Sequence, residues 1–104
     1  MFTIVESLLF QSLVSDYWDE DERGRFSAWL AANPDAGDAI KESGGCRKVR
    51  WGRAGSGKSS GVRVIYFKRL AKGEIWLLTI YAKSRRDTIP AHVLKELKEM
   101  LDED

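Results

Sequence analysis

The sequence predicts a single α+β domain in which an antiparallel sheet packs with two N-terminal helices and a C-terminal helix. Apolar residues recur with helical spacing up to Asn33 and again after Pro90, whereas residues 46–82 alternate or run apolar as strands do. A length of 104 residues suits one domain with one modest core. We therefore expect the element order β-α-α-β-β-β-α over residues 1–104.

The first elements are a short strand and a helix. Residues 2–5 (Phe-Thr-Ile-Val) are rich in β-branched side chains and favour a strand. Ser7 is placed to cap the helix that follows, because a serine hydroxyl can accept a hydrogen bond from an amide of the first turn. The apolar positions of this helix, Leu9, Leu13 and Tyr17, recur every four residues, as they do along one face of a helix.

The acidic run 19–22 is expected at the N-terminus of a second helix, since carboxylates favour the positive end of a helix dipole. Its apolar stripe is Phe26, Trp29 and Leu30. Pro34 disfavours helical geometry in the residue before it, so this helix should end at Asn33. Residues 35–45 are then expected to form a loop that ends in a glycine pair.

The rest of the chain predicts three strands and a helix. The strands are 46–51, 62–67 and the nearly unbroken apolar run 75–82, with a hairpin turn at Lys72-Gly73 between the last two. Pro90 suits the first turn of the final helix. The predicted buried stripe of that helix is Val93, Leu94, Leu97, Met100 and Leu101.

Composition excludes several classes of protein. With 43% hydrophobic and 32% charged residues, the chain is too apolar for general disorder. Its longest apolar stretch, 75–82, is far shorter than the roughly 20 residues that span a bilayer. The N-terminus has no basic region and an early acid, Glu6, so we expect no signal peptide, no membrane and a cytoplasmic location. With Cys46 as its one cysteine, the sequence predicts no disulfide, no metal site and no cofactor.

The net charge of +1 conceals a strong polarity along the chain. Residues 1–40 carry a net charge of −6, residues 41–86 carry +11, and residues 87–104 carry −4. Surface strands often carry scattered Lys and Arg, but thirteen bases among 46 residues, mixed with aromatic side chains, favour a face that binds a polyanion.

Residues 52–59 match the phosphate-binding pattern G-x-x-x-x-G-K-[ST]. In a nucleotide site, such a loop lies between a parallel strand and the N-terminus of a helix. Here a sequence with strand periodicity follows the loop, and no hydrophobic strand ends in an acid that could hold Mg²⁺. A basic loop between two antiparallel strands is the better interpretation.

The candidates for chemistry are bases. His92 is expected on the solvent side of the last helix and Cys46 in a buried strand, so neither is favoured as a catalytic group. Lys48 and Arg50 should point to one face of a strand, with Arg63 as their neighbour on the next. Lys83 follows the central strand.

Such bases suit RNA cleavage through the 2′-hydroxyl. They can hold the scissile phosphate, stabilise the charge of the transition state and assist proton transfer. Arg suits the phosphate clamp, whereas a Lys crowded by cations has a lowered pKa and can accept a proton. The same bases could also serve only to bind RNA or an acidic partner.

Several spaced motifs resemble the RelE/ParE superfamily of toxins from type II toxin–antitoxin systems. They are residues 44–51 (Gly-Gly-Cys-Arg-Lys-Val-Arg-Trp) and residues 61–67 after a basic loop. The stretches 33–38 and 77–83 are similar to the HigB-type branch. The resemblance covers essentially the whole chain. It implies a RelE-like fold and a ribosome-dependent mRNA endonuclease that inhibits translation.

The resemblance also implies roles and partners. Lys48, Arg50, Arg63 and Lys83 match positions that serve catalysis in RelE-like toxins. Other bases are expected to bind RNA: Arg47, Arg53, Lys58, Arg85 and Arg86. The expected partners are the ribosome, mRNA and an antitoxin from the same operon with a helix-turn-helix.

The sequence departs from the RelE pattern in two places. Ser84 stands near the position of an arginine, and the C-terminal tyrosine has no counterpart, although Tyr81 is nearby. Arg85 or Arg86 could substitute in the last strand region. Two rival functions stay open: a ParE-like poison of DNA gyrase and a non-catalytic RNA-binding module.

Overall fold

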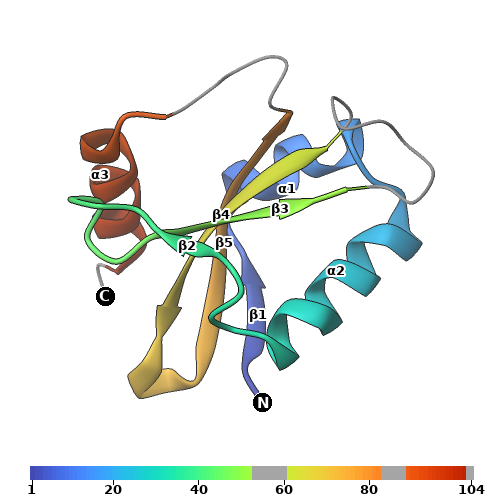
Figure 1. Cartoon of the computed structure of the whole chain (residues 1–104), viewed down its shortest axis with the longest axis horizontal. Coiled ribbons are helices and arrows are strands. Elements are labelled where there is room, and N and C mark those ends of the chain that lie inside the picture. Colours follow the sequence, from blue (N-terminus) through green and yellow to red (C-terminus); the bar gives the residue numbers. More distant parts are fainter. Residues whose placement is uncertain (53–60, 83–88, 103–104) are drawn as a thin grey trace.

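A computed structural model describes residues 1–52, 61–82 and 89–102. Within these ranges one five-stranded sheet has the order β1-β5-β4-β3-β2 (Figure 1). The strands are β1 (Thr3–Glu6), β2 (Asp38–Ala39), β3 (Arg47–Trp51), β4 (Val62–Arg69) and β5 (Glu74–Ala82). The helices are α1 (Leu8–Leu13), α2 (Glu20–Ala32) and α3 (Ala91–Asp102), with 3-10 turns η1 (Val14–Asp16) and η3 (Leu70–Lys72). The predicted α+β class and element order are confirmed, and β2 is an addition within the expected loop.

The sheet is mixed and not wholly antiparallel. The pairs β2–β3, β3–β4 and β4–β5 are antiparallel as predicted, but β1 runs parallel to β5. The expectation of an antiparallel sheet is therefore wrong at this edge. The chain leaves β1 through two helices, so no hairpin turn fixes the direction of the strand. Ile4 instead packs on the core that α1 and α2 cover.

Ser7 fixes α1 to the sheet. Its hydroxyl accepts a hydrogen bond from the Phe10 amide (3.0 Å), as the predicted cap requires, and donates one to the Leu78 carbonyl of β5 (2.8 Å). Phe10 and Val14 are fully buried, whereas Leu9 is 41% exposed. Of the apolar positions that recur every four residues, Leu13 and Tyr17 are partly buried and pack against the same core.

The predicted boundaries of α2 agree with the structure. The Asp19 side chain caps its start by accepting a hydrogen bond from the Glu22 amide (2.8 Å), and Asn33 ends it before Pro34. Phe26 and Leu30 are fully buried. Trp29 is half-buried, and its ring lies 5.2 Å from that of Trp51 at the end of β3.

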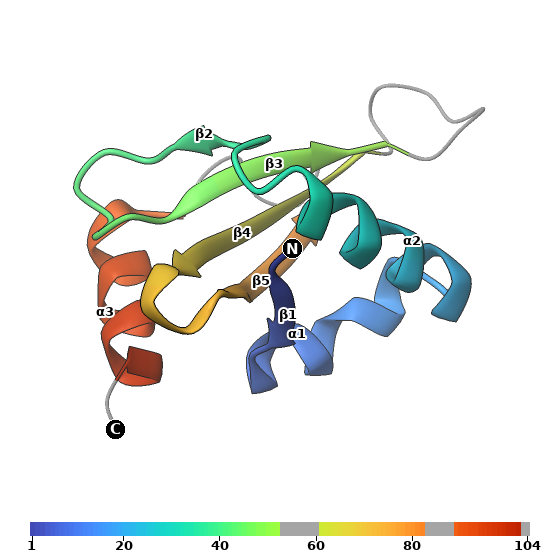
Figure 2. The ribbon, with the colours of Figure 1, turned by 90° about the horizontal axis from the view of Figure 1, so that it is seen from below.

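Apolar layers cover both faces of the sheet (Figure 2). Val62, Val64 and Tyr66 of β4 belong to the core with α1 and α2. The alternate residues Ile65 and Phe67 pack in a second core with Leu94 of α3. β4 is therefore a central strand that is buried on both sides, and the predicted hairpin turn at Gly73 joins it to β5.

The stripe of α3 is partly as predicted. Leu94 is buried and Leu97 and Leu101 pack against the second core, but Met100 is 68% exposed. Met100 lies about 120° around the helix from Leu94, so it points away from the sheet that Leu94 covers. Among the helices of the described ranges, none combines the length and apolar character needed to cross a membrane.

Residues 34–37, which lead into β2, are held close to β3 and β4. The Tyr66 hydroxyl accepts a hydrogen bond from the Gly37 amide (3.0 Å) and donates one to the Pro34 carbonyl (2.9 Å). Asp35 pairs with Lys68, and this hydrogen bond lowers the pKa of the Asp35 carboxyl. A Cβ atom on Gly37 would lie 2.6 Å from the Lys48 carbonyl oxygen, so a glycine is needed at this close approach.

Two glycine substitutions should therefore change stability in opposite directions. Gly37→Ala should lower the free energy of unfolding by about 1–3 kcal/mol, because the methyl group overlaps the β3 backbone. Gly24→Ala, in the interior of α2 with open space around it, should raise it by about 0.5–1 kcal/mol. Urea unfolding of both variants measures the difference. A Gly37→Ala variant as stable as the natural chain would contradict the close packing of β2 on β3.

Candidate functional site

Arg50 and Arg63 lie directly opposite each other on β3 and β4. Residues in such a pair point to the same face of a sheet with Cβ atoms about 5 Å apart. Lys48 shares this face, because it is two residues from Arg50 and opposite Ile65. We call Lys48, Arg50 and Arg63 the basic cluster. The predicted convergence of these three bases is thus present in the register of the strands.

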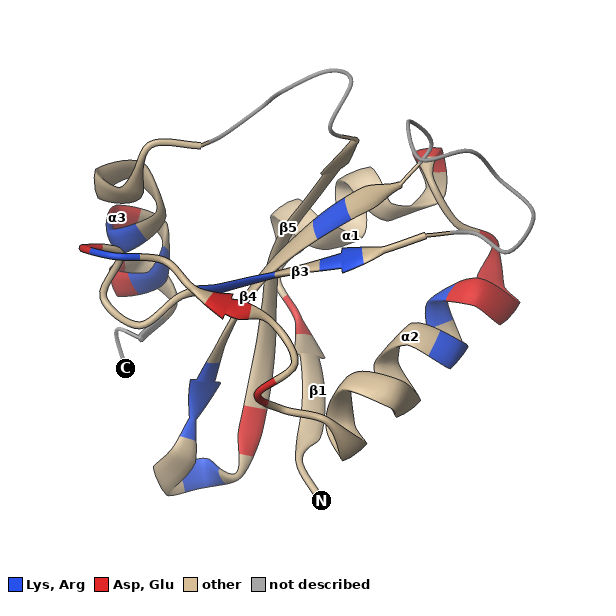
Figure 3. Cartoon of the chain, viewed as in Figure 1, with Lys and Arg blue, Asp and Glu red and all other residues tan. Residues whose placement is uncertain are grey.

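The basic positions of β3 and β4 lie side by side in the sheet (Figure 3). They are on the face that carries α3, but α3 packs over Ile65 and Phe67, further along β4 than Arg63. Arg50 is exposed and Lys48 is half-buried. These two members of the cluster are therefore both accessible to solvent, Arg50 more than Lys48.

Arg63 is the buried member, with 9% of its surface exposed. Within residues 1–52, 61–82 and 89–102, no acidic side chain forms a salt bridge with Arg63, Arg50 or Lys48. A guanidinium removed from water without an anion is unfavourable. The site is consequently suited to bind an anion that enters from outside.

Two further side chains share this face and were not predicted as part of the site. Tyr81 of β5 is opposite Arg63, so Arg50, Arg63 and Tyr81 form one row across three strands. Asp38 of β2 is opposite Lys48. The sequence placed Tyr81 only near the site, since its position depends on the β4–β5 register. Asp38 could not be placed because its strand was expected to be a loop.

Arg47 lies on the other face of β3. It is opposite Tyr66, and its Nη2 donates hydrogen bonds to the Gly37 carbonyl (2.6 Å) and the Asp35 carbonyl (3.2 Å). The structure therefore does not bring Arg47 together with the basic cluster. Its guanidinium holds the segment before β2.

The remaining bases of the +11 segment are divided. Lys68 and Arg69 lie at the opposite end of β4 from Arg63. Lys68 pairs with Asp35, and a guanidinium nitrogen of Arg69 lies 3.9 Å from a Glu74 carboxylate oxygen. The other candidates fall outside the described residues: Arg53, Lys58, Lys83, Arg85 and Arg86. The described bases that lie together are thus Lys48, Arg50 and Arg63, fewer than the thirteen bases of residues 41–86.

The cysteine, the histidine and the phosphate-loop match of the sequence all lie in contexts that do not favour catalysis. Cys46 is fully buried next to β3, and His92 is exposed on α3, both as expected. The phosphate-loop match is followed by β4, a strand antiparallel to β3, and not by a helix. A nucleotide-binding loop is followed by a helix, so the strand that follows here favours the interpretation as a loop between two antiparallel strands.

The fold and the basic cluster define a class, an α+β domain that presents converging bases on one face of its sheet. No protein-family model matches the chain. Among solved structures it is similar to the Escherichia coli toxin RelE, in a double arginine-to-alanine mutant in the free state. The TM-score is 0.59 at 10% identity, over 93% of this chain and 96% of that chain. The chain therefore has a RelE-like fold.

Replacing Arg63 should separate stability from anion binding. Arg63→Met removes a buried charge that has no acidic partner among the described residues, so it should raise the free energy of unfolding by about 1 kcal/mol. The same change should weaken binding of the chain to heparin. Chemical unfolding and elution from heparin resin at increasing salt measure the two effects. A destabilised variant would mean that Arg63 has a structural role.

Proposed function

We propose that this chain is the toxin of a type II toxin–antitoxin system and acts as a ribosome-dependent mRNA endonuclease of the HigB-type branch. The observation that carries the proposal is the pairing of Arg50 with Arg63, with Lys48 beside them on the same face. The RelE-like fold supports it, because the similar structure is that of a toxin. The partners we propose are the ribosome, mRNA and an antitoxin from the same operon, all in the cytoplasm.

The chemistry would be an attack by the RNA on its own backbone. The 2′-oxygen forms a bond to phosphorus, the bond to the 5′-oxygen breaks, and a 2′,3′-cyclic phosphate remains. Arg50 and Arg63 would hold the phosphate oxygens and stabilise the additional negative charge of the transition state. These steps are proposed to need no metal ion.

Lys48 would take part in proton transfer, because an Arg guanidinium stays charged and cannot accept a proton. It would receive the proton from the 2′-hydroxyl as that oxygen attacks. Lys83 is proposed on sequence grounds to help the 5′-oxygen gain its proton, and it lies outside the described residues. Acid and base roles would thus belong to lysines, with the phosphate held by arginines.

Brief expression followed by mapping of mRNA 5′ ends tests the proposal. We expect cuts that follow the codon phase, reduced about 100-fold or more in Lys48→Ala and Arg63→Ala because each removes a group that acts in the transition state. Lys41→Ala is the matched control, since it removes an exposed base of the same segment away from the cluster.

Other outcomes would identify a different function. Intact mRNA together with induction of the DNA-damage response would replace the proposal with a gyrase poison. Intact mRNA without that response, but with RNA bound in solution, would indicate a non-catalytic RNA-binding module.

Binding of a short single-stranded RNA should weaken steeply as salt increases, because each phosphate contact releases counterions. Arg50→Gln should lower the slope of log K against log salt by about 1. Fluorescence anisotropy from 50 to 200 mM salt, about the range in which such contacts are sensitive, measures this. A slope that Arg50→Gln leaves unchanged would mean that Arg50 does not contact phosphate.

A further inference from the structure

Asp38 is an acidic side chain at the edge of the basic cluster. It lies opposite Lys48 in the β2–β3 pair and is exposed, so its carboxylate shares a face of the sheet with the three bases (Figure 3). A carboxylate repels phosphate, so at this position it lowers the affinity of the face for any polyanion. Anion binding alone therefore does not account for Asp38.

The structure fixes Asp38 through the residue before it. The Gly37 amide donates a hydrogen bond to the Tyr66 hydroxyl (3.0 Å), and the Gly37 carbonyl accepts one from Arg47 (2.6 Å). Tyr66 is fully buried, and Gly37 packs on the Lys48 backbone too closely for a Cβ atom. A strand of two residues at the edge of the sheet is thus held by three contacts, and its one acidic side chain keeps its position beside Lys48.

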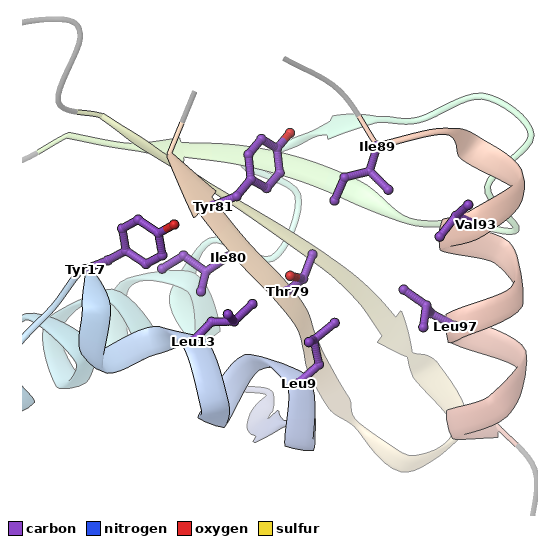
Figure 4. A pocket seen from close by; sticks show the side chains of 9 residues that line it. All are labelled: Leu9, Leu13, Tyr17, Thr79, Ile80, Tyr81, Ile89, Val93 and Leu97. Atoms are coloured by element: carbon purple, nitrogen blue, oxygen red, sulfur yellow. The ribbon is translucent and has the colours of Figure 1, made fainter. Parts of the chain in front are cut away.

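In the strand register of the described residues, Asp38 is the one acid in the two rows that contain the cluster. The first row is Asp38, Lys48, Ile65 and Thr79, and the second is Arg50, Arg63 and Tyr81. On the far side, Tyr81 borders a hollow of about 350 Å³ whose lining side chains are all uncharged (Figure 4). Within residues 1–52, 61–82 and 89–102, no salt bridge joins Asp38 to Lys48 or to another base. Its carboxylate is therefore available to accept a hydrogen bond from a ligand.

We propose that the Asp38 carboxylate accepts a hydrogen bond from a ribose 2′-hydroxyl and makes the basic cluster selective for RNA over DNA. The inference rests on the proposed function, since it names what that same site recognises. A carboxylate only accepts hydrogen bonds, and the 2′-hydroxyl is a donor that RNA has and DNA lacks. Acidic side chains bind ribose hydroxyls in the same way in dinucleotide sites.

The hydroxyl concerned belongs to a nucleotide that flanks the scissile phosphate, and is not the one that attacks in the proposed cleavage. β2 is the outermost strand on its side of the sheet, next to the strand that carries Lys48 and Arg50. A single strand of RNA held at the cluster would therefore pass Asp38 where it leaves the sheet.

Fluorescence anisotropy of the full chain with two short oligonucleotides, one of uridines and one of deoxyuridines, tests this. The two differ only in the 2′-hydroxyl, so base recognition contributes nothing to the difference. The natural chain should bind the RNA about 10-fold more tightly, the effect expected of a hydrogen bond to a charged acceptor. Asp38→Ala should abolish this preference by weakening RNA binding about 5-fold and strengthening DNA binding about 2-fold, because repulsion of phosphate is removed. Asp38→Asn should keep part of the preference, since its amide oxygen still accepts a hydrogen bond.

Glu42→Gln is the matched control, since it removes an exposed acid from the turn between β2 and β3 and leaves Asp38 in place. It should not change the preference for RNA. Urea unfolding checks that each variant is folded.

A natural chain that binds the two oligonucleotides equally or not at all would overturn the inference, as would Asp38→Ala with the preference intact. Equal loss of affinity for both in Asp38→Ala would also overturn it, because Asp38 would then only hold β2 in place. The cleavage assay on ribosomes is independent of these measurements. Cleavage with an unchanged preference in Asp38→Ala removes the inference alone, and a preference that depends on Asp38 without cleavage removes the proposed endonuclease alone.

Discussion

Arg50 and Arg63 carry like charges in directly opposite positions, an arrangement that disfavours strand pairing. The pairing is imposed by the other residues of β4. Val64 must face α1 and α2 while Ile65 faces α3, and a shift by one residue would exchange the two sets. The two apolar layers therefore fix the register, and the register holds the bases together despite their repulsion.

The end of β3 that carries Arg50 is anchored from behind. Trp51 points to the opposite face, where its ring lies 5.2 Å from that of Phe26 and its Nε1 donates a hydrogen bond to the Glu22 carboxylate (2.9 Å). Glu22 is itself buried against the sheet. Aromatic packing and one hydrogen bond to α2 thus hold the end of β3 that carries the exposed Arg50. Residues on the opposite face of the sheet therefore position the site.

The sequence was sufficient for every helix and strand of the described ranges except β2, and for the convergence of Lys48, Arg50 and Arg63, because side-chain alternation along neighbouring antiparallel strands follows from the local pattern. It was insufficient wherever a distant contact decides the outcome. The start of α1 is joined to β5 by the bond of Ser7 to Leu78, and β1 runs parallel to β5, and both contacts join residues more than 70 positions apart. In the sequence, Arg47 is one more base in a basic run. In the structure, Gly37 packs closely against β3, and the Arg47 guanidinium donates a hydrogen bond to the Gly37 carbonyl.

The parallel pairing of β1 with β5 has a consequence for synthesis of the chain. β1 precedes β2, β3 and β4 in the chain, but its partner is β5, with Thr3 opposite Glu74, so all three intervening strands are synthesised before β1 can pair. Such long-range pairing is slow to form. α1 waits for the same strand, because Ser7 bonds to Leu78. A nascent chain thus has all the bases of β3 and β4 before it has β5, the strand that joins them to β1 in one sheet.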